Sequence, residues 1–252
     1  MNPSIKREWR LWLVALSFFT RLPVQIADFK EADLNYAAKY FPLVGVLVGM
    51  VAAAVYGLAI LVWPIELAVL ASMAATLWLT GAFHEDGLAD AADGLGGGWQ
   101  KEQALTIMRD SRLGTFGAIA LFLALLTKFE ALTHLSAPLL PAIMLAGHSL
   151  SRFAAVLVIY TQPYVRDEGK AKPLATKLSR NELLFAGLFG LAPLVLFAHR
   201  FLWALVPVVL VWFWFSHMLK KRLGGYTGDC LGAMQQLCEI AFYLGVLVWG
   251  VM

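Results

Sequence analysis

Four carboxylates lie within nine consecutive positions of an otherwise apolar chain, in the stretch HEDGLADAADGLGGG at residues 84–98. Asp86, Asp90 and Asp93 are spaced i, i+4 and i+7, which places them on one face of a helix. Carboxylates about 6 Å apart repel by roughly 3 kcal/mol per pair at an effective dielectric constant near 20, so this face favours a bound cation. Oxygen ligands select hard cations such as magnesium, manganese or calcium. The spacing therefore predicts a divalent-metal site.

Glu85 points about 100° away from this face and reaches the same site only from its edge. Magnesium takes one or two carboxylates and completes its shell with water and substrate phosphate, so Mg²⁺ here indicates a phosphate-bearing substrate. The neighbouring glycines predict open backbone that a bulky ligand can approach; they are Gly87, Gly94, Gly96, Gly97 and Gly98. The alternative is a solvated acidic segment whose carboxylates stabilise a helix N-terminus.

Two further stretches contain residues that suit a phosphate site. KEQALTIMRDSRLGTFG (101–117) brings Arg109 and Arg112 to the same side of the chain, and arginine binds phosphate in a bidentate manner. GGYTGDCLGA (224–233) is a glycine-rich turn before an apolar run, where backbone N–H groups bind anions. Within it we expect Gly225 and Thr227 to contact substrate and Asp229 to bind metal or substrate. Ordinary anchoring by basic residues and a simple helix cap are the alternatives.

His148 and Arg152 lie four residues apart in GHSLSRF (147–153), inside an apolar run. Because a charge within the bilayer is costly, Arg152 should face a polar cavity or an acidic partner. We predict that both residues contact substrate, with a structural ion pair as the alternative. Lys128 and Glu130 are predicted to be structural, with the Lys128 side chain extending outward to water.

The elements that must position these residues are membrane helices. The chain has 252 residues, of which 60% are hydrophobic and 15% charged, and its mean hydropathy is +0.70. Soluble domains average about 25% charged residues, and apolar runs of about 20 residues cross a bilayer as helices. We predict an all-α, polytopic membrane bundle in a single domain (1–252) with about seven spans. These are 40–63, 65–83, 114–136, 138–160, 182–199, 201–219 and 231–251.

The basic residues set the expected orientation. Of the 20 Lys and Arg, all but three fall on one side of the predicted spans, and positive residues mark the cytoplasmic side. The exceptions are Arg200 on the other side and Lys128 and Arg152 within spans. The acidic loop (84–113) and a basic loop (161–181) are then cytoplasmic, and the site faces the cytoplasm. The net charge of +3 follows from this bias and does not indicate nucleic-acid binding.

The N-terminal segment and the cysteines complete the predicted organisation. Arg21 and Pro23 interrupt the first apolar stretch, so residues 8–26 are predicted to form an interfacial or re-entrant helix. Cys230 and Cys238 lie roughly 12 Å apart along a helix axis, too far for a disulfide. The sequence leaves the oligomeric state open, a homo-oligomer included.

The ordered set of motifs resembles the cobalamin synthase family, the adenosylcobinamide-GDP ribazoletransferases. The resemblance is carried by FFTRLPV (18–24), FPLVGVLVG (41–49), HEDGLADAADGLGGG (84–98), MRDSRLGTFG (108–117), GHSLSR (147–152) and GGYTGDCLGA (224–233). It implies a multi-pass enzyme of the bacterial inner membrane that uses Mg²⁺. The implied substrates are adenosylcobinamide-GDP and α-ribazole or its 5′-phosphate. The implied products are adenosylcobalamin or its phosphate, and GMP.

For this reaction we expect Asp86, Asp90 and Asp93 to hold one or two Mg²⁺ ions on the diphosphate. Glu85, Asp93 or His84 would accept the proton of the attacking ribose hydroxyl. Arg109, Arg112 and Arg152 would hold the leaving phosphate. Two other classes remain open from the residues alone. One is a prenyl- or CDP-alcohol-type transferase that also uses aspartate-bound magnesium, and the other is a transporter, for which ionisable groups near the midplane are expected.

Overall fold

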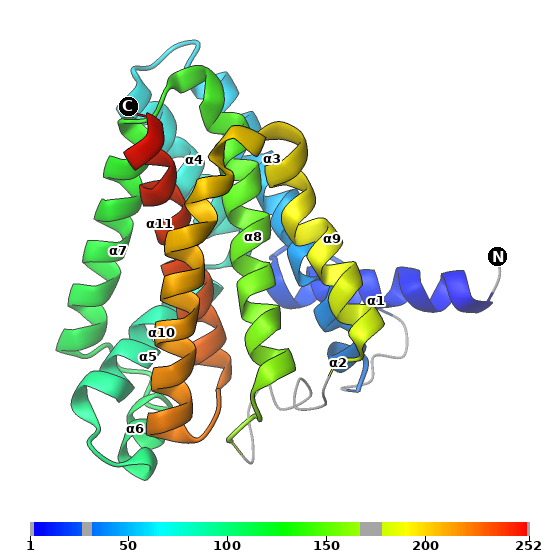
Figure 1. Cartoon of the computed structure of the whole chain (residues 1–252), viewed down its shortest axis with the longest axis vertical. Coiled ribbons are helices and arrows are strands. Elements are labelled where there is room, and N and C mark those ends of the chain that lie inside the picture. Colours follow the sequence, from blue (N-terminus) through cyan, green and yellow to red (C-terminus); the bar gives the residue numbers. More distant parts are fainter. Residues whose placement is uncertain (1–2, 27–31, 167–177, 251–252) are drawn as a thin grey trace.

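The computed structural model describes residues 3–26, 32–166 and 178–250, which are almost wholly helical (Figure 1). Lys170, Lys172 and Lys177 of the predicted basic loop lie outside the described residues. The helices are α1 (Pro3–Phe19), α2 (Asp33–Ala37), η1 (Ala38–Tyr40), α3 (Phe41–Ala59), α4 (Ile65–Thr80), α5 (Phe83–Gly97), α6 (Lys101–Ile107), α7 (Thr115–Thr133), η2 (Ala137–Leu139), α8 (Leu140–Thr161), α9 (Arg180–Phe197), η4 (His199–Ala204), α10 (Leu205–Leu223) and α11 (Gly228–Gly250).

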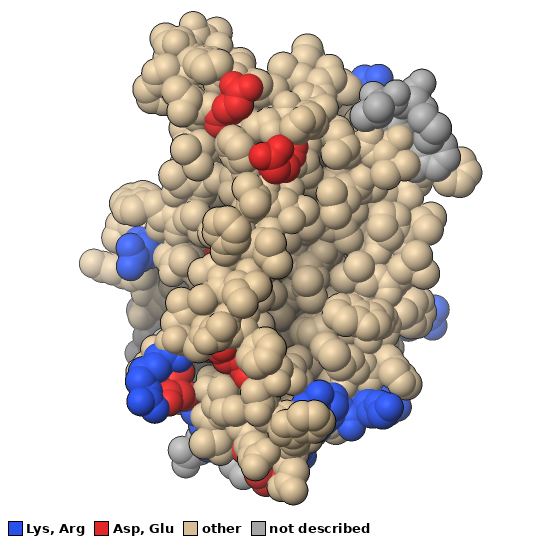
Figure 2. Space-filling view, turned by 90° about the vertical axis from the view of Figure 1, so that its left-hand side faces the viewer, with Lys and Arg blue, Asp and Glu red and all other residues tan. Residues whose placement is uncertain are grey.

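The long helices confirm the predicted membrane bundle. Six helical segments of the described chain are long and apolar enough to cross a bilayer, and the bent pair α4–α5 brings the number to seven. Large apolar side chains are exposed along their length, including Leu58, Phe122 and Leu210. In Figure 2 most of the surface between the two ends of the molecule carries neither Lys or Arg nor Asp or Glu. Exposed apolar surface of this extent is stable only against lipid.

Helices α8 and α11 form the interior of the bundle. Both are mostly buried, whereas less than a third of the residues are buried in the spans of α7, α9 and α10. Helix α8 packs against α3 and α9, and α11 packs against α5, α8 and α10. Cys230 and Cys238 are buried and unpaired on α11, as predicted. The polar residues of α8 and α11 therefore meet inside the protein, away from lipid.

The acids were predicted on one face of a helix within a loop at 84–113, and the structure shows that most of this segment is helical, forming α5 and α6. Gly81 and Ala82 lie between α4 and α5, and both residues have left-handed backbone, with φ of 65° and 55°. These two residues turn the chain by 85° between α4 and α5. The acids are thereby held on a rigid helix at one end of the bundle (Figure 1).

Helix α1 lies crosswise to the long helices in Figure 1, the orientation typical of a helix at a membrane surface. It spans Pro3–Phe19, so it begins and ends earlier than the predicted segment 8–26. Two ion pairs fasten it to the start of the bundle. Arg10 Nη2 lies 2.8 Å from Asp33 Oδ1, and Lys39 Nζ lies 2.6 Å from Glu8 Oε2. Its C-terminal end thereby brings Phe18 and Phe19 against α5.

Candidate active site

A cavity of about 280 Å³ lies where α5, the start of α11 and the segment after α8 meet. The acidic groups on its wall are Asp86, exposed on the first turn of α5, and Asp229, on the first turn of α11. Two arginines also line it: Arg109, just after α6, and Arg166, after α8. The lining residues are Phe18, Phe83, Asp86, Gly87, Met108, Arg109, Tyr164, Arg166, Gly228 and Asp229. We call this the acidic cavity; it contains both the carboxylates and the guanidinium groups that a metal–diphosphate complex requires.

Acidic and basic side chains lie close together in the acidic cavity. Arg166 Nη2 lies 2.7 Å from Asp229 Oδ2. Asp90, one turn after Asp86, is half-buried and feels the charges of Asp229, Asp86 and Arg166. Burial raises the pKa of Tyr164, so its hydroxyl remains a neutral donor on the cavity wall. Arg166 and Tyr164 were not predicted as site residues, because no sequence motif connects them with Asp229.

Helices α5 and α11 cross at direct backbone contact. A Cβ added at Gly232 would lie 3.0 Å from the His84 carbonyl oxygen and 3.2 Å from Gly87 Cα. Three other glycines of the acidic stretch are also packed: Gly94 and Gly98 contact α6 and Gly96 contacts Phe116. The prediction of open backbone was wrong for these three, because neighbouring segments occupy their space. It holds better for Gly87, which lines the acidic cavity, and for Gly97, where an added Cβ would meet only Ile107 Cδ1 at 3.4 Å. Gly87 and Gly232 allow the start of α5 to pack closely against the start of α11.

Replacing Gly232 by Val is expected to separate α5 from α11, because the added side chain meets backbone atoms that cannot rotate away. Overpacking of this kind costs about 1–3 kcal/mol of stability, and it moves Asp86 away from Asp229. We expect a lowered unfolding temperature and at least tenfold slower turnover. Gly57→Val is the matched control, since a Cβ at Gly57 meets nothing within 4 Å. Equal behaviour of the two variants would contradict the close-contact role.

Asp93 faces away from the acidic cavity, toward the N-terminus of α7. Its two carboxylate oxygens accept hydrogen bonds from the backbone N–H groups of Gly114 and Gly117, each at 2.8 Å. The side chain is buried. A carboxylate that caps a helix N-terminus is stabilised by the helix dipole and by these bonds. The third acid of the predicted metal face is thus engaged in joining α5 to α7.

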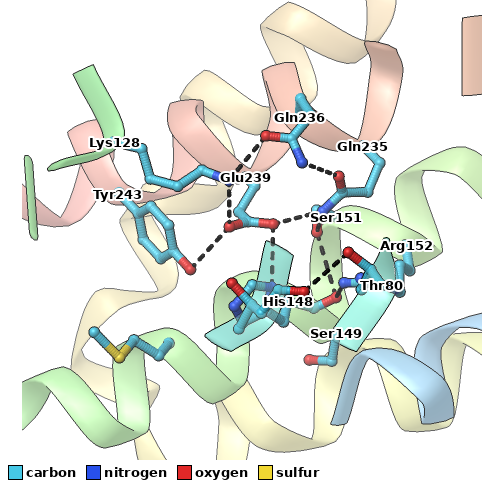
Figure 3. A network of polar contacts seen from close by, with 12 residues as sticks. Thr80, Lys128, His148, Ser149, Ser151, Arg152, Gln235, Gln236, Glu239 and Tyr243 are labelled. Carbon is cyan, nitrogen blue, oxygen red and sulfur yellow. Dashed lines mark hydrogen bonds and ion pairs between the residues drawn. The ribbon is translucent and has the colours of Figure 1, made fainter. Parts of the chain in front are cut away.

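Glu85 belongs to a second, fully buried group of polar side chains, shown in part in Figure 3. Its Oε1 accepts a hydrogen bond of 2.8 Å from Gln236 Nε2. At the centre of the group is Glu239 on α11. Lys128 Nζ and His148 Nδ1 lie 3.0 Å and 3.2 Å from its two carboxylate oxygens, and the Tyr243 hydroxyl donates to it at 3.3 Å. We call Glu85, Lys128, His148, Arg152, Gln235, Gln236, Glu239 and Tyr243 the buried polar network.

The prediction that Lys128 extends outward to water was wrong. Its side chain is buried, with its ammonium group between Glu239 and the Gln236 amide oxygen, which is 2.8 Å away. A charge this deep in an apolar bundle requires an opposite charge. Glu239 was missed at the sequence level, although it is an isolated acid in the last apolar run. The available signal was that Lys128 and Arg152, as basic residues within apolar runs, each need an acidic partner.

The structure places His148 and Arg152 apart from the acidic cavity. His148 is buried beside Glu239, and Arg152 Nη1 donates to the His148 carbonyl oxygen at 2.9 Å. The ion-pair alternative therefore describes His148. His84 is buried as well and its ring stacks on Phe19, with 5.4 Å between centroids. None of the three is among the residues that line the acidic cavity.

Of the remaining residues predicted to contact substrate, one lines the acidic cavity and the others do not. Arg109 lines the acidic cavity, whereas Arg112 is exposed and lies 2.7 Å from Asp110. Gly225 packs against the Pro163 carbonyl, beside the backbone pairing of Tyr226 with residues 163–165. Thr227 is fully buried, and its hydroxyl caps α11 by accepting from the Cys230 N–H at 3.3 Å. Gly225 and Thr227 thus hold the turn that presents Asp229.

The expected Mg²⁺ requires carboxylate oxygens that face one space. Within residues 3–26, 32–166 and 178–250 no three His, Cys, Asp or Glu side chains come close enough to hold a metal alone. Asp86 and Asp229 nevertheless supply carboxylate oxygens to one cavity, and Asp90 lies one turn after Asp86 on α5. Magnesium binds one or two protein carboxylates and takes its other ligands from water and phosphate. The residues fit a site that substrate completes.

Comparison with known proteins identifies the family. The family described as cobalamin-5-phosphate synthase matches residues 11–247. An adenosylcobinamide-GDP ribazoletransferase of Ralstonia pickettii is 47% identical over 98% of both chains, and one of Ralstonia nicotianae is 48% identical over 99% of both. One of Vibrio cholerae is 44% identical over 99% of this chain and 97% of its own. No solved structure matches the chain. The chain belongs to the cobalamin-5-phosphate synthase family.

Proposed function

We propose that this chain joins adenosylcobinamide-GDP to α-ribazole, or to its 5′-phosphate, and releases GMP in the last assembly step of cobalamin synthesis. The relatives are named for this transfer, and they match nearly the whole chain. The observation that carries the proposal is the acidic cavity, where two carboxylates and two arginines from four segments line one space. A diphosphate bridged to a divalent metal needs this combination of charges.

The reaction forms one bond and breaks one. A ribose hydroxyl oxygen of ribazole attacks the phosphorus attached to cobinamide, and the bond from that phosphorus to the bridging oxygen breaks. GMP leaves with the bridging oxygen. Arg109 and Arg166 lie on the cavity wall and neutralise charge on the phosphates, the main contribution of a protein to such a transfer. Tyr164 donates from the same wall.

The hydroxyl proton needs an acceptor within reach of the cavity. Glu85 is bonded to Gln236, Asp93 caps α7, and the His84 ring stacks on Phe19. We assign the proton to Asp90, which is half-buried one turn beyond Asp86 and interacts electrostatically with Asp86 and Asp229. Asp86 and Asp229 are then the residues for Mg²⁺, which when bound neutralises the diphosphate and polarises its P–O bonds.

The distribution of charge supports a cytoplasmic site in the bacterial inner membrane. Basic side chains gather toward one end of the molecule in Figure 2. The C-terminal end of α10, with Lys220, Lys221 and Arg222 in its last turn, directly precedes the turn that presents Asp229. Because basic residues mark the cytoplasmic side, the acidic cavity opens to the compartment that supplies nucleotides.

A transport function would use the charges inside the bundle. The space beside the buried polar network, however, is about 10 Å³, and Glu239 is bonded to side chains on α7, α8 and α11. Such a packed ion-pair group holds helices together and leaves no path for a substrate. The transferase function is therefore favoured.

The proposal is tested by measuring GMP release by the purified protein in lipid vesicles. We expect release to require both adenosylcobinamide-GDP and α-ribazole, to stop on chelation with EDTA and to return on addition of Mg²⁺. A prenyl diphosphate or a CDP-alcohol offered in place of cobinamide-GDP should give no product. Accumulation of substrate inside sealed vesicles without GMP release would contradict the proposal and favour transport.

A further inference from the structure

An aromatic cavity of about 20 Å³ lies directly beside the acidic cavity. The two cavities share Phe18, Phe83 and Gly228 as lining residues. The other residues of its wall are Phe19, Phe41, His84, Arg152, Ala155, Leu231 and Gly232. We call this the aromatic cavity. Four phenylalanines and a histidine ring from α1, α3 and α5 thus meet next to the proposed reaction site.

The rings of the aromatic cavity suit a flat, apolar ligand. The Phe19 and His84 rings are stacked with 10° between their planes, and Phe18 and Phe41 are nearly parallel at 8°. Phe83 stands edge-on to Phe18 and Phe19. Stacked and edge-to-face contacts both stabilise a further aromatic ring placed among them.

A buried hydrogen-bond donor in the same wall has no partner. The Arg152 side chain is 3% exposed, and its Nη1 donates to the His148 carbonyl oxygen. Its Nε is buried, and no residue in the described part of the chain accepts a hydrogen bond from it. Buried donors are nearly always bonded in native proteins, so an unpaired one in a cavity wall indicates a ligand with an acceptor atom.

We propose that the aromatic cavity binds the benzimidazole base of ribazole, with Arg152 Nε–H donating to the ring nitrogen that carries no ribose. This inference rests on the proposed function and adds to it the subsite of the acceptor. The base has two fused aromatic rings and one free acceptor nitrogen, which matches a wall of phenyl rings with one unpaired donor. Its ribose then lies toward the acidic cavity, across the boundary formed by Phe18 and Phe83.

The size of the aromatic cavity adds one requirement. A volume of about 20 Å³ holds a single water and not a bicyclic ring. Phe18 and Phe83 are only partly buried and belong to both cavities, so rotation of these two rings joins the spaces and admits the base. Guanine is the other base in the reaction. It would bring several donors and acceptors into this apolar wall, most of which would stay unpaired.

The test compares ribazole with an analogue in which a C–H group replaces the free ring nitrogen. For the natural chain we expect the KM for the analogue to be about tenfold or more above that for ribazole, since it loses a hydrogen bond to a charged donor. The KM for adenosylcobinamide-GDP should stay the same. For Arg152→Met, the two acceptors should be used with nearly equal kcat/KM. GMP release with ribazole is measured before this comparison, because it tests the proposed function separately from the subsite.

Equal use of ribazole and its analogue by the natural chain would overturn the subsite while leaving the transferase function intact. Unchanged discrimination in Arg152→Met would do the same. If Arg152→Met does not fold, the comparison of acceptors in the natural chain still decides. Phe18→Ala provides a second variant, with Phe122→Ala on the exposed face of α7 as its control. We expect the KM for ribazole to rise in Phe18→Ala and to stay unchanged in Phe122→Ala. An equal KM for ribazole in the two variants would contradict the proposal.

Discussion

Substitution of Asp86 by asparagine is expected to slow GMP release by about 10²- to 10³-fold, the loss typical when one preorganised charged contact at a reacting phosphate is removed. The side chain is exposed at the acidic cavity, and no described residue forms an ion pair or hydrogen bond with it. Its removal should therefore leave the fold unchanged. Initial rates at saturating substrate and Mg²⁺ measure the effect, and unfolding temperature checks the fold.

Asp110→Asn is the matched control for Asp86→Asn. Asp110 is also an exposed aspartate, in the segment between α6 and α7, but it pairs with Arg112 outside the acidic cavity. The Arg112 guanidinium lowers the pKa of Asp110, so Asp110→Asn removes a negative charge at neutral pH. We expect near-normal turnover for Asp110→Asn and a large loss for Asp90→Asn as well. Near-normal turnover of Asp86→Asn would remove it from the site.

The sequence predicted the membrane helices well because each depends on local composition. An apolar run of about 20 residues has no stable alternative to a helix in lipid, and all seven predicted spans correspond to helices. The helical spacing of Asp86, Asp90 and Asp93 was likewise correct. The three side chains nevertheless have different surroundings, because tertiary packing decides which residues lie next to each. Asp93 meets the N-terminus of α7, whereas Asp86 meets solvent and Asp229.

The long-range partners could not be predicted from one sequence. Gln236 and Glu85 are 151 positions apart, and Lys128 and Gln236 are 108 apart. Each residue type indicates that a partner is needed, but not which residue supplies it. The same limit applies to Arg166, whose position after Pro163 carries no signal for a contact with Asp229. Glu85 was predicted to reach the metal site from its edge because it directly precedes Asp86, although its Oε1 accepts a hydrogen bond from Gln236 in the interior of the bundle.

The buried polar network leads to the second large effect. Glu239→Gln is expected to destabilise the protein by about 3–5 kcal/mol, because loss of one partner leaves an uncompensated buried charge. The charge concerned is on Lys128, 3.0 Å from the carboxylate. The loss should appear as a large drop in unfolding temperature in detergent or lipid nanodiscs. Glu130→Gln is the matched control, since Glu130 lies two residues after Lys128 on α7 but is exposed beside His134.

A double variant separates charge compensation from mere loss of packing. Lys128→Met combined with Glu239→Gln removes both charges of the closest pair, so no ammonium group remains buried without a carboxylate. Neutral replacements of buried ion pairs are often as stable as the pair itself, and we expect the double variant to regain most of the stability lost by Glu239→Gln. Additive loss in the double variant would show that the two residues act independently. If the double variant regains stability, charge pairing in the buried polar network holds α7 and α8 to α11. Through the bond from Gln236 to Glu85, the same network also holds α5, the helix that carries Asp86.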